Sequence, residues 1–108
     1  MPSTEDHLIG PIIAERRLSA RISNTEIQEF IIRMAAPERE KNGDYRCSWE
    51  FVAPGYRKVR SQTGIDGFQA IHLANRMIGV TLWVIAQEHG YHFTWEGSDD
   101  IGFSEFHA

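Results

Sequence analysis

The residue types most often used in catalysis form no recognised catalytic motif in this sequence. Cys47 is the single thiol, and a nucleophilic cysteine requires partial exposure together with a lowered pKa. Tyr45 and Trp49 lie two residues to either side of Cys47, so strand alternation predicts that all three share one buried face. Cys47 is therefore expected to be an inert part of the core, and the sequence predicts no catalytic residue.

The histidines do not form a pattern of metal ligands. His89 and His92 are three residues apart, but Gly90 between them is expected to end a helix. Paired histidine ligands need an unbroken helix face, and no His-Glu-x-x-His motif or cluster of cysteine and histidine occurs. We therefore expect no bound metal.

Three further segments resemble functional sites only in part. Segment 64–67, Gly-Ile-Asp-Gly, precedes a predicted helix, but the carboxylate of Asp66 would repel a phosphate at the helix start. Asp99 and Asp100 are adjacent carboxylates in a predicted loop, without companions for acid–base catalysis. The basic side chains of segment 57–60 are typical of an exposed edge strand. No cofactor is expected.

Alternation of apolar and polar residues predicts four strands in the first part of the chain. Such alternation places one face of each strand in the core and the other in water, as in an antiparallel sheet. Arg16 is the one polar residue on the apolar face of the first strand. The expected strands are residues 12–22, 26–36, 45–53 and 56–62.

A long helix is predicted from about residue 67 to 89. Asp66 and Gln69 form the expected capping box at its start, and Gly90 is the expected glycine cap at its end. Alternation over 91–96 then predicts a short final strand. The expected fold is α+β: an antiparallel meander of about four strands, one long helix packed on it, and a short C-terminal strand.

The predicted helix is apolar over roughly 220° of its circumference, which is more than packing on one sheet requires. It is therefore expected to pack on two sides or to take part in association, including a homodimer. Trp83 lies at the centre of the remaining arc, beside His72 and Arg76, a composition typical of binding hot spots. The alternative is that the N-terminal segment or the tail covers Trp83. Gly79, one turn earlier, is expected to leave room for the indole.

Length and composition restrict the class of protein. The chain has 108 residues, of which 42% are hydrophobic and 24% charged, as in ordinary soluble proteins. We expect one domain over residues 1–108, with 1–10 flexible. A net charge of −4 disfavours nucleic-acid binding, and no apolar run is long enough for a membrane span. The N-terminal residues lack the pattern of a signal peptide, which favours a cytoplasmic location.

The negative charge is unevenly distributed along the chain. The first 60 residues contain ten basic and nine acidic side chains, whereas the rest contains six acidic side chains and Arg76 alone. An acidic surface accelerates association with a basic partner. Glu96, Asp99 and Asp100 are therefore candidate partner-binding residues, together with the aromatic and basic residues of the helix.

Several short motifs resemble a small uncharacterised bacterial domain family. They are Arg-Arg-Leu at 16–18, Cys-Ser-Trp at 47–49, the helix start Gly-x-Asp-x-x-Gln-Ala at 64–70 and Gly-Phe at 102–103. Gly67 stands where that family often carries a hydroxyl residue. The resemblance implies a bacterial origin and a stand-alone α+β domain, and it carries over no catalytic residue.

Two functions from different classes fit these observations. The favoured one is a non-enzymatic protein-binding module, such as an immunity or antitoxin-like protein that neutralises a basic bacterial effector. Its support is the small size, the missing catalytic motifs and the acidic second half. The alternative is a small enzyme or ligand-binding protein, with a pocket between helix and sheet near Cys47, Trp49 and His72.

Overall fold

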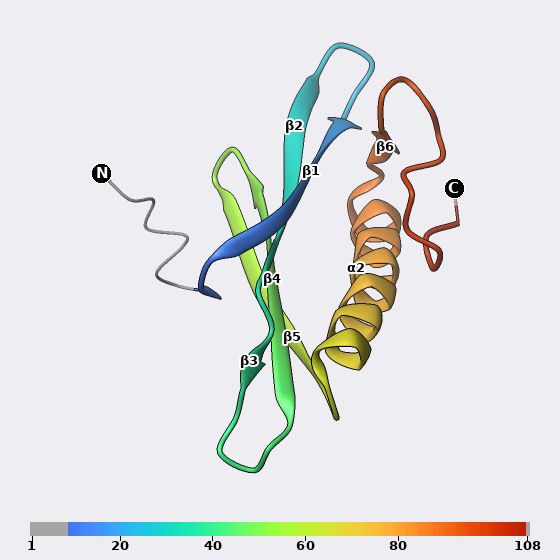
Figure 1. Ribbon diagram of the computed structural model, residues 1–108. Coiled ribbons are helices and arrows are strands. Elements are labelled where there is room, and N and C mark those ends of the chain that lie inside the picture. Colours follow the sequence, from blue (N-terminus) through green and yellow to red (C-terminus); the bar gives the residue numbers. More distant parts are fainter. Residues whose placement is uncertain (1–8, 108) are drawn as a thin grey trace.

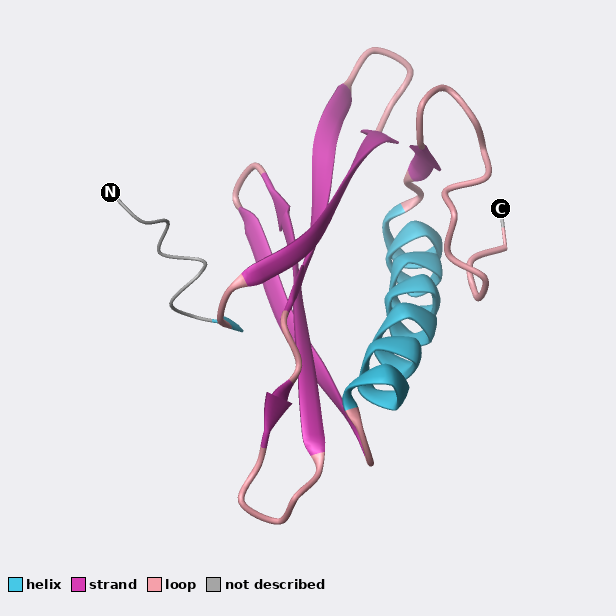
Figure 2. Ribbon diagram, viewed as in Figure 1, coloured by secondary structure: helices cyan, strands magenta, loops and turns pink. Residues whose placement is uncertain are grey.

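The computed structural model describes residues 9–107, and it consists of one sheet with a helix packed against one face (Figures 1 and 2). In chain order, the elements are β1 (Ile12–Arg21), β2 (Ile27–Ala35), β3 (Glu38–Arg39), β4 (Tyr45–Ala53), β5 (Tyr56–Gly64), α2 (Gly67–His89) and β6 (His92–Thr94). The predicted α+β class, with its long helix and short last strand, is confirmed. The flexibility predicted for residues 1–10 falls mostly outside the described residues.

All the strand pairs are antiparallel, and β2 lies between β1 and β4. β5 pairs along the whole length of β4, and β6 pairs with the end of β1. β3 continues the line of β2 along β4, after an interruption at Pro37, which has no N–H to donate. The strands β1 to β5 thus form a meander. After α2 the chain returns to the sheet, where β6 pairs with the edge of β1 that faces away from β2 (Figure 1).

The structure differs most from the prediction in two places. Segment 37–44 lies between two of the predicted strands, but it contains β3, which pairs with the start of β4 through Glu38–Arg46 and Arg39–Tyr45. The last strand is shorter than the predicted 91–96, because Trp95 pairs with Ser98 around a tight turn instead of continuing the sheet. In both cases backbone pairing, which side-chain alternation does not report, determines the boundary.

The helix-facing side of the sheet and the inner side of α2 form the hydrophobic core. Aromatic rings lie at its centre, where the ring centroid of Phe30 is 5.7 Å from that of Phe51 and 5.1 Å from that of Phe93. The sheet contributes Leu18, Ala20, Phe30, Ile32, Met34, Cys47, Trp49, Phe51, Ala53 and Phe93, and the helix contributes Ala70, Ala74, Ile78, Leu82, Ile85 and Ala86.

Local hydrogen bonds fix both ends of α2. The carboxylate of Asp66 accepts a hydrogen bond from the backbone N–H of Gln69 at 2.8 Å, and the Gln69 side chain accepts one from the N–H of Ile65 at 2.8 Å. Gly90 ends the helix in the left-handed conformation, with φ 68°. A Cβ atom at Gly64 would lie 2.5 Å from the backbone nitrogen of Ala70, so only glycine allows β5 to approach the first helical turn this closely.

The other face of the sheet carries a row of alternating charges, called here the charge row. Each member forms a salt bridge with the next, and the row runs from β2 through β1, back to β2 and then through β4 to β5. The members are Glu29, Arg17, Glu15, Arg33, Glu50 and Arg57. Glu50 is fully buried although it lies on this face, because its neighbours Arg33 and Arg57 lie over it.

Candidate functional site

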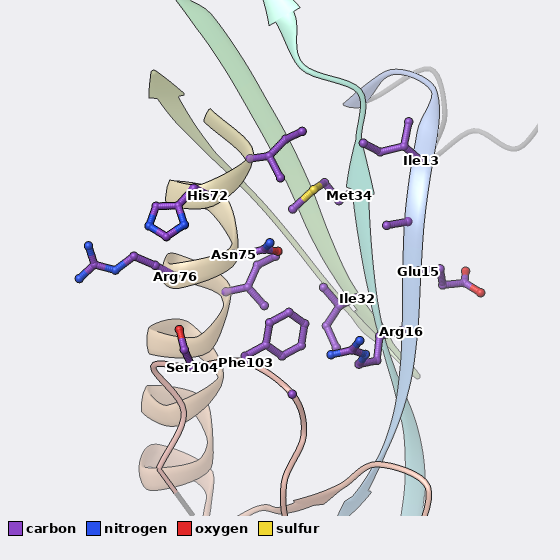
Figure 3. Close-up of a pocket in the computed structure, with 14 residues that line it drawn as sticks. Ile13, Glu15, Arg16, Ile32, Met34, His72, Asn75, Arg76, Phe103 and Ser104 are labelled. Atoms are coloured by element: carbon purple, nitrogen blue, oxygen red, sulfur yellow. The ribbon is translucent and has the colours of Figure 1, made fainter. Parts of the chain in front are cut away.

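A pocket of about 530 Å³ lies between α2, the strands β1 and β2, and the C-terminal segment, defined here as residues 95–107 (Figure 3). Its apolar walls include Ala14, Ile32, Met34, Ile71, Ile78 and Phe103. Its polar lining includes Arg16, His72, Asn75, Arg76 and Ser104. A mostly apolar cavity of this size with a few polar groups is typical of small-molecule sites.

The topology of the sheet explains why the pocket forms at this place. β6 pairs with Ser19, Ala20 and Arg21 alone, so no described strand covers the earlier part of β1. The four consecutive residues 13–16 all line the pocket, because the edge of β1 has no partner strand there and is accessible along the whole stretch. The C-terminal segment then folds back along α2 (Figure 1), and its residues 102–104 line the pocket.

Arg16 is the charged group in the interior of this pocket. It lies on the helix-facing side of β1, where its neighbours on that face, Leu18 and Ala20, belong to the core. Its guanidinium carbon lies 3.8 Å from the ring centroid of Trp95 and 5.0 Å from that of Phe103. Its Nη1 donates a hydrogen bond to the carbonyl oxygen of Ile101 at 3.2 Å. Arg16 therefore attaches the C-terminal segment to the sheet through cation–π contacts and one hydrogen bond.

Two glycines allow the C-terminal segment to lie close to the rest of the fold. Gly102 has φ 82°, and a Cβ atom there would collide with the guanidinium of Arg16. A Cβ atom at Gly79 of α2 would lie 3.2 Å from the Cβ atoms of Phe103 and Glu105. The prediction that Gly79 leaves room for Trp83 is therefore wrong, because the space belongs to the C-terminal segment.

The polar side chains around the pocket point in different directions (Figure 3). Asn75 faces the interior from α2, and its amide makes no hydrogen bond with any described residue. His72 lies at the rim, and Arg76 points outward and pairs with Glu105 at 3.3 Å. Glu15 points to the opposite face of the sheet, where the hydrogen bond from Arg33 holds the pKa of its carboxyl below the usual value.

The structure brings two of the six predicted partner-binding residues, His72 and Arg76, to the pocket. Trp83 lies farther along α2, and its side chain is 41% exposed, so the C-terminal segment covers Gly79 and leaves the indole accessible. Val80 and Val84 beside it are each 37% exposed. The outer face of α2 thus presents an apolar patch, in which Val80 and Val84 belong to the predicted wide apolar arc and Trp83 to the arc beside it.

The three predicted acidic residues belong to the loop that follows β6. The carboxylate of Asp99 accepts a hydrogen bond from Nε2 of His92 at 2.9 Å, and that of Asp100 accepts one from the N–H of Gly102 at 2.9 Å. Glu96 has a positive φ of 51° in the turn after Trp95. Two of these carboxylates therefore organise the loop at the start of the C-terminal segment.

Cys47 is buried, as predicted, and its Sγ lies 3.7 Å from the carbonyl oxygen of Ala35. Burial raises the pKa of the Cys47 thiol to about 11. Cys47 and Trp49 do not line the pocket, which lies nearer to β1 than the sequence suggested.

The raised pKa of Cys47 predicts slow alkylation of the folded protein. At pH 9 the native thiol stays mostly protonated, whereas in urea it ionises near its usual value and becomes accessible. We expect iodoacetamide to label the protein at pH 9 at least about tenfold faster in urea than in buffer. Mass spectrometry after timed quenching measures both rates, and equal rates would contradict the burial of this thiol.

The described residues show no cluster of three or more histidine, cysteine or carboxylate side chains that could hold a metal ion. Within the same residues, no helix has the length and hydropathy needed to cross a membrane.

Sequence reasoning missed the pocket residues Phe103 and Ser104, because the position of the C-terminal segment depends on tertiary packing. It missed Asn75 because the helix pattern does not show which part of α2 borders the pocket. One signal was present in the sequence, however. Arg16 interrupts an otherwise apolar strand face, and an unexplained cation on a core face is a reasonable indicator of a site.

The comparisons with known proteins identify a family without assigning an activity. No curated protein and no solved structure shows significant similarity to the chain. One family model, described as a domain of unknown function (DUF6968), matches residues 14–105, which include both Arg16 and the part of the C-terminal segment that encloses the pocket. The chain therefore belongs to the DUF6968 family.

Proposed function

We propose that this chain is a binding domain for a small ligand with a mostly apolar body. The observation that carries the proposal is the half-open pocket of about 530 Å³, which three separate parts of the chain border and which mostly aliphatic and aromatic side chains line. Ligand sites in proteins commonly have volumes of about 300–1,000 Å³ and combine an apolar lining with a few polar groups. Asn75, an exposed residue of α2 that lines the pocket, supplies such a group, and its amide makes no hydrogen bond with any described residue.

Titration with 1-octanol, followed by NMR of the backbone amides, tests this proposal. We expect saturable shifts for residues that line the pocket, such as Ile71 and Ser104. Replacing Ala14 with phenylalanine fills the pocket from β1 and is expected to weaken octanol binding by about tenfold or more, because the ring takes the place of the ligand.

The matched control for this experiment is Val59→Phe on β5. Val59 is 40% exposed on the opposite face of the sheet, so its replacement adds a similar ring without reaching the pocket. Octanol binding should remain unchanged in this variant. Absence of saturable shifts in the unmodified protein, or equal losses in the two variants, would refute the proposed function.

A second candidate function rests on the exposed patch of Trp83, Val80 and Val84 on the outer face of α2. We propose for this patch the role of a protein-binding surface in an immunity or antitoxin-like protein that neutralises a basic bacterial effector in the cytoplasm. Tryptophan is enriched at binding hot spots, and the acidic residues of the second half of the chain would attract a basic partner.

Calorimetry with the purified product of the neighbouring gene tests the second candidate. We expect 1:1 binding, which Trp83→Ala weakens by about 2 kcal/mol or more. Phe68→Ala is the matched control, since Phe68 is exposed at the other end of the same helix. A stable homodimer that Trp83→Ala dissociates would instead assign the patch to self-association.

A further inference from the structure

We infer that the ligand of this pocket is an amphipathic acid, whose apolar body lies among the aliphatic side chains and whose carboxylate binds Arg16. The inference rests on the proposed ligand-binding function and specifies the chemical class of the ligand.

Arg16 differs from the arginines on the opposite face of the sheet. Arg17, Arg33 and Arg57 each form salt bridges with glutamates in the charge row. For Arg16, no carboxylate of any described residue lies within salt-bridge distance, and its contacts are two aromatic rings and one carbonyl oxygen. Arg16 is half-buried, and a partly desolvated cation is stabilised most by an anion with matching hydrogen-bond geometry.

The contacts of Arg16 also leave it able to bind a carboxylate. A guanidinium has five N–H donors in one plane, of which the hydrogen bond to Ile101 uses one. The contacts with the rings of Trp95 and Phe103 are cation–π contacts, which use none of these N–H donors in a conventional hydrogen bond. The edge carries the N–H groups that bind a carboxylate in a bidentate manner, and the ring contacts hold it in one orientation.

The carboxylates nearest to the pocket do not compete for Arg16. Glu15 lines the pocket with its backbone, but its carboxylate lies on the opposite face of the sheet with Arg33, as Figure 3 shows. Glu105 pairs with Arg76 at the rim. The interior of the pocket therefore has the positive charge of Arg16, and the amide of Asn75 on the facing helix offers a further N–H donor.

Three ligands with the same eight-carbon chain test the inference on the unmodified protein: octanoate, 1-octanol and octylammonium. We expect octanoate to bind about 10- to 100-fold more tightly than 1-octanol, since a hydrogen bond to a charged group has about that effect on affinity. Octylammonium should bind most weakly. Dissociation constants come from the same NMR titration, which also reports whether each ligand shifts the pocket residues.

Two variants connect the preference to Arg16. Arg16→Gln removes the charge and is expected to make the affinities for octanoate and 1-octanol equal within about threefold. Arg17→Gln, at the next residue but on the opposite face, should keep the preference. If Arg16→Gln fails to fold, Arg16→Lys keeps the charge but loses the bidentate geometry, and it should reduce the preference for octanoate without abolishing it.

The outcomes separate this inference from the proposed function. If 1-octanol binds in the pocket as tightly as octanoate, the inference is overturned and the ligand-binding function stands. If no ligand shifts the pocket residues, both are overturned. A preference for octanoate that survives in Arg16→Gln would also overturn the inference, because a group other than Arg16 would then bind the carboxylate.

Discussion

Replacing Glu50 with glutamine is expected to lower the free energy of unfolding by about 3 kcal/mol, one of the two largest effects of a single substitution that we predict. Glu50 is fully buried in β4, and its two carboxylate oxygens accept hydrogen bonds from Arg33 and Arg57. The amide of glutamine removes the charge and turns one acceptor into a donor, so Arg57 loses its carboxylate partner and Arg33 loses one of its carboxylate partners in a partly desolvated place. Urea denaturation measures the loss.

Glu40→Gln provides a matched control for this prediction. Glu40 also pairs with an arginine, Arg46, at 3.0 Å, but both side chains are partly exposed. Exposed ion pairs contribute about 0–1 kcal/mol, so this variant should be close to the unmodified protein in stability. Similar losses in the two variants would show that burial does not distinguish Glu50.

A double-mutant cycle separates the Glu50–Arg57 pair from the rest of the charge row. Arg57→Met removes one partner of Glu50, whereas Arg33 keeps its second carboxylate partner, Glu15. We expect the double variant Glu50→Gln, Arg57→Met to be more stable than the sum of the single losses implies, because the two residues interact directly. Additive losses would exclude a direct coupling.

The second large effect is expected for Ile101→Ala, which should lower the free energy of unfolding by about 3 kcal/mol. Ile101 is 1% exposed and belongs to the hydrophobic core, although it lies in the C-terminal segment outside any helix or strand. Its removal leaves a cavity at the place where Arg16 attaches the segment to the sheet. Thermal and urea denaturation measure the loss.

Ile65→Ala is the control of the same chemistry. Ile65 also lies outside helices and strands, but it is 75% exposed, and its truncation should change the stability by less than about 0.5 kcal/mol. Hydrogen exchange adds a local measurement, since Ile101→Ala should also increase exchange of the amides of residues 101–106. Unchanged stability in Ile101→Ala would mean that the C-terminal segment does not contribute to the core.

The sequence predicted the strands and the helix because their signals are local. Alternation around Cys47 predicted which face of β4 is buried, and Asp66 with Gln69 predicted where α2 begins. These features depend on residues a few positions apart, so the chain itself contains most of the information. The short strand β3 was missed because its two charged residues, Glu38 and Arg39, show no alternation and pair through the backbone.

The site was less predictable, because its parts come from distant positions in the chain. His72 and Arg76 were predicted as neighbours on one helix face, and both lie at the pocket. Phe103 and Gly79 meet across the surface of α2, and no periodic pattern connects them. Arg16 was visible as an exception on an apolar face, but its role required the position of Ile101.

The hydrogen bond between Arg16 and Ile101 joins residues that are 85 positions apart, and this separation has a consequence for how the site forms. Contacts between distant residues are costly in chain entropy and tend to form late in folding. During synthesis, the pocket can close only after residues 101–103 have left the ribosome. A ligand that bridges both sides would then stabilise the closed chain by mass action, so that occupancy and completion of the fold become linked.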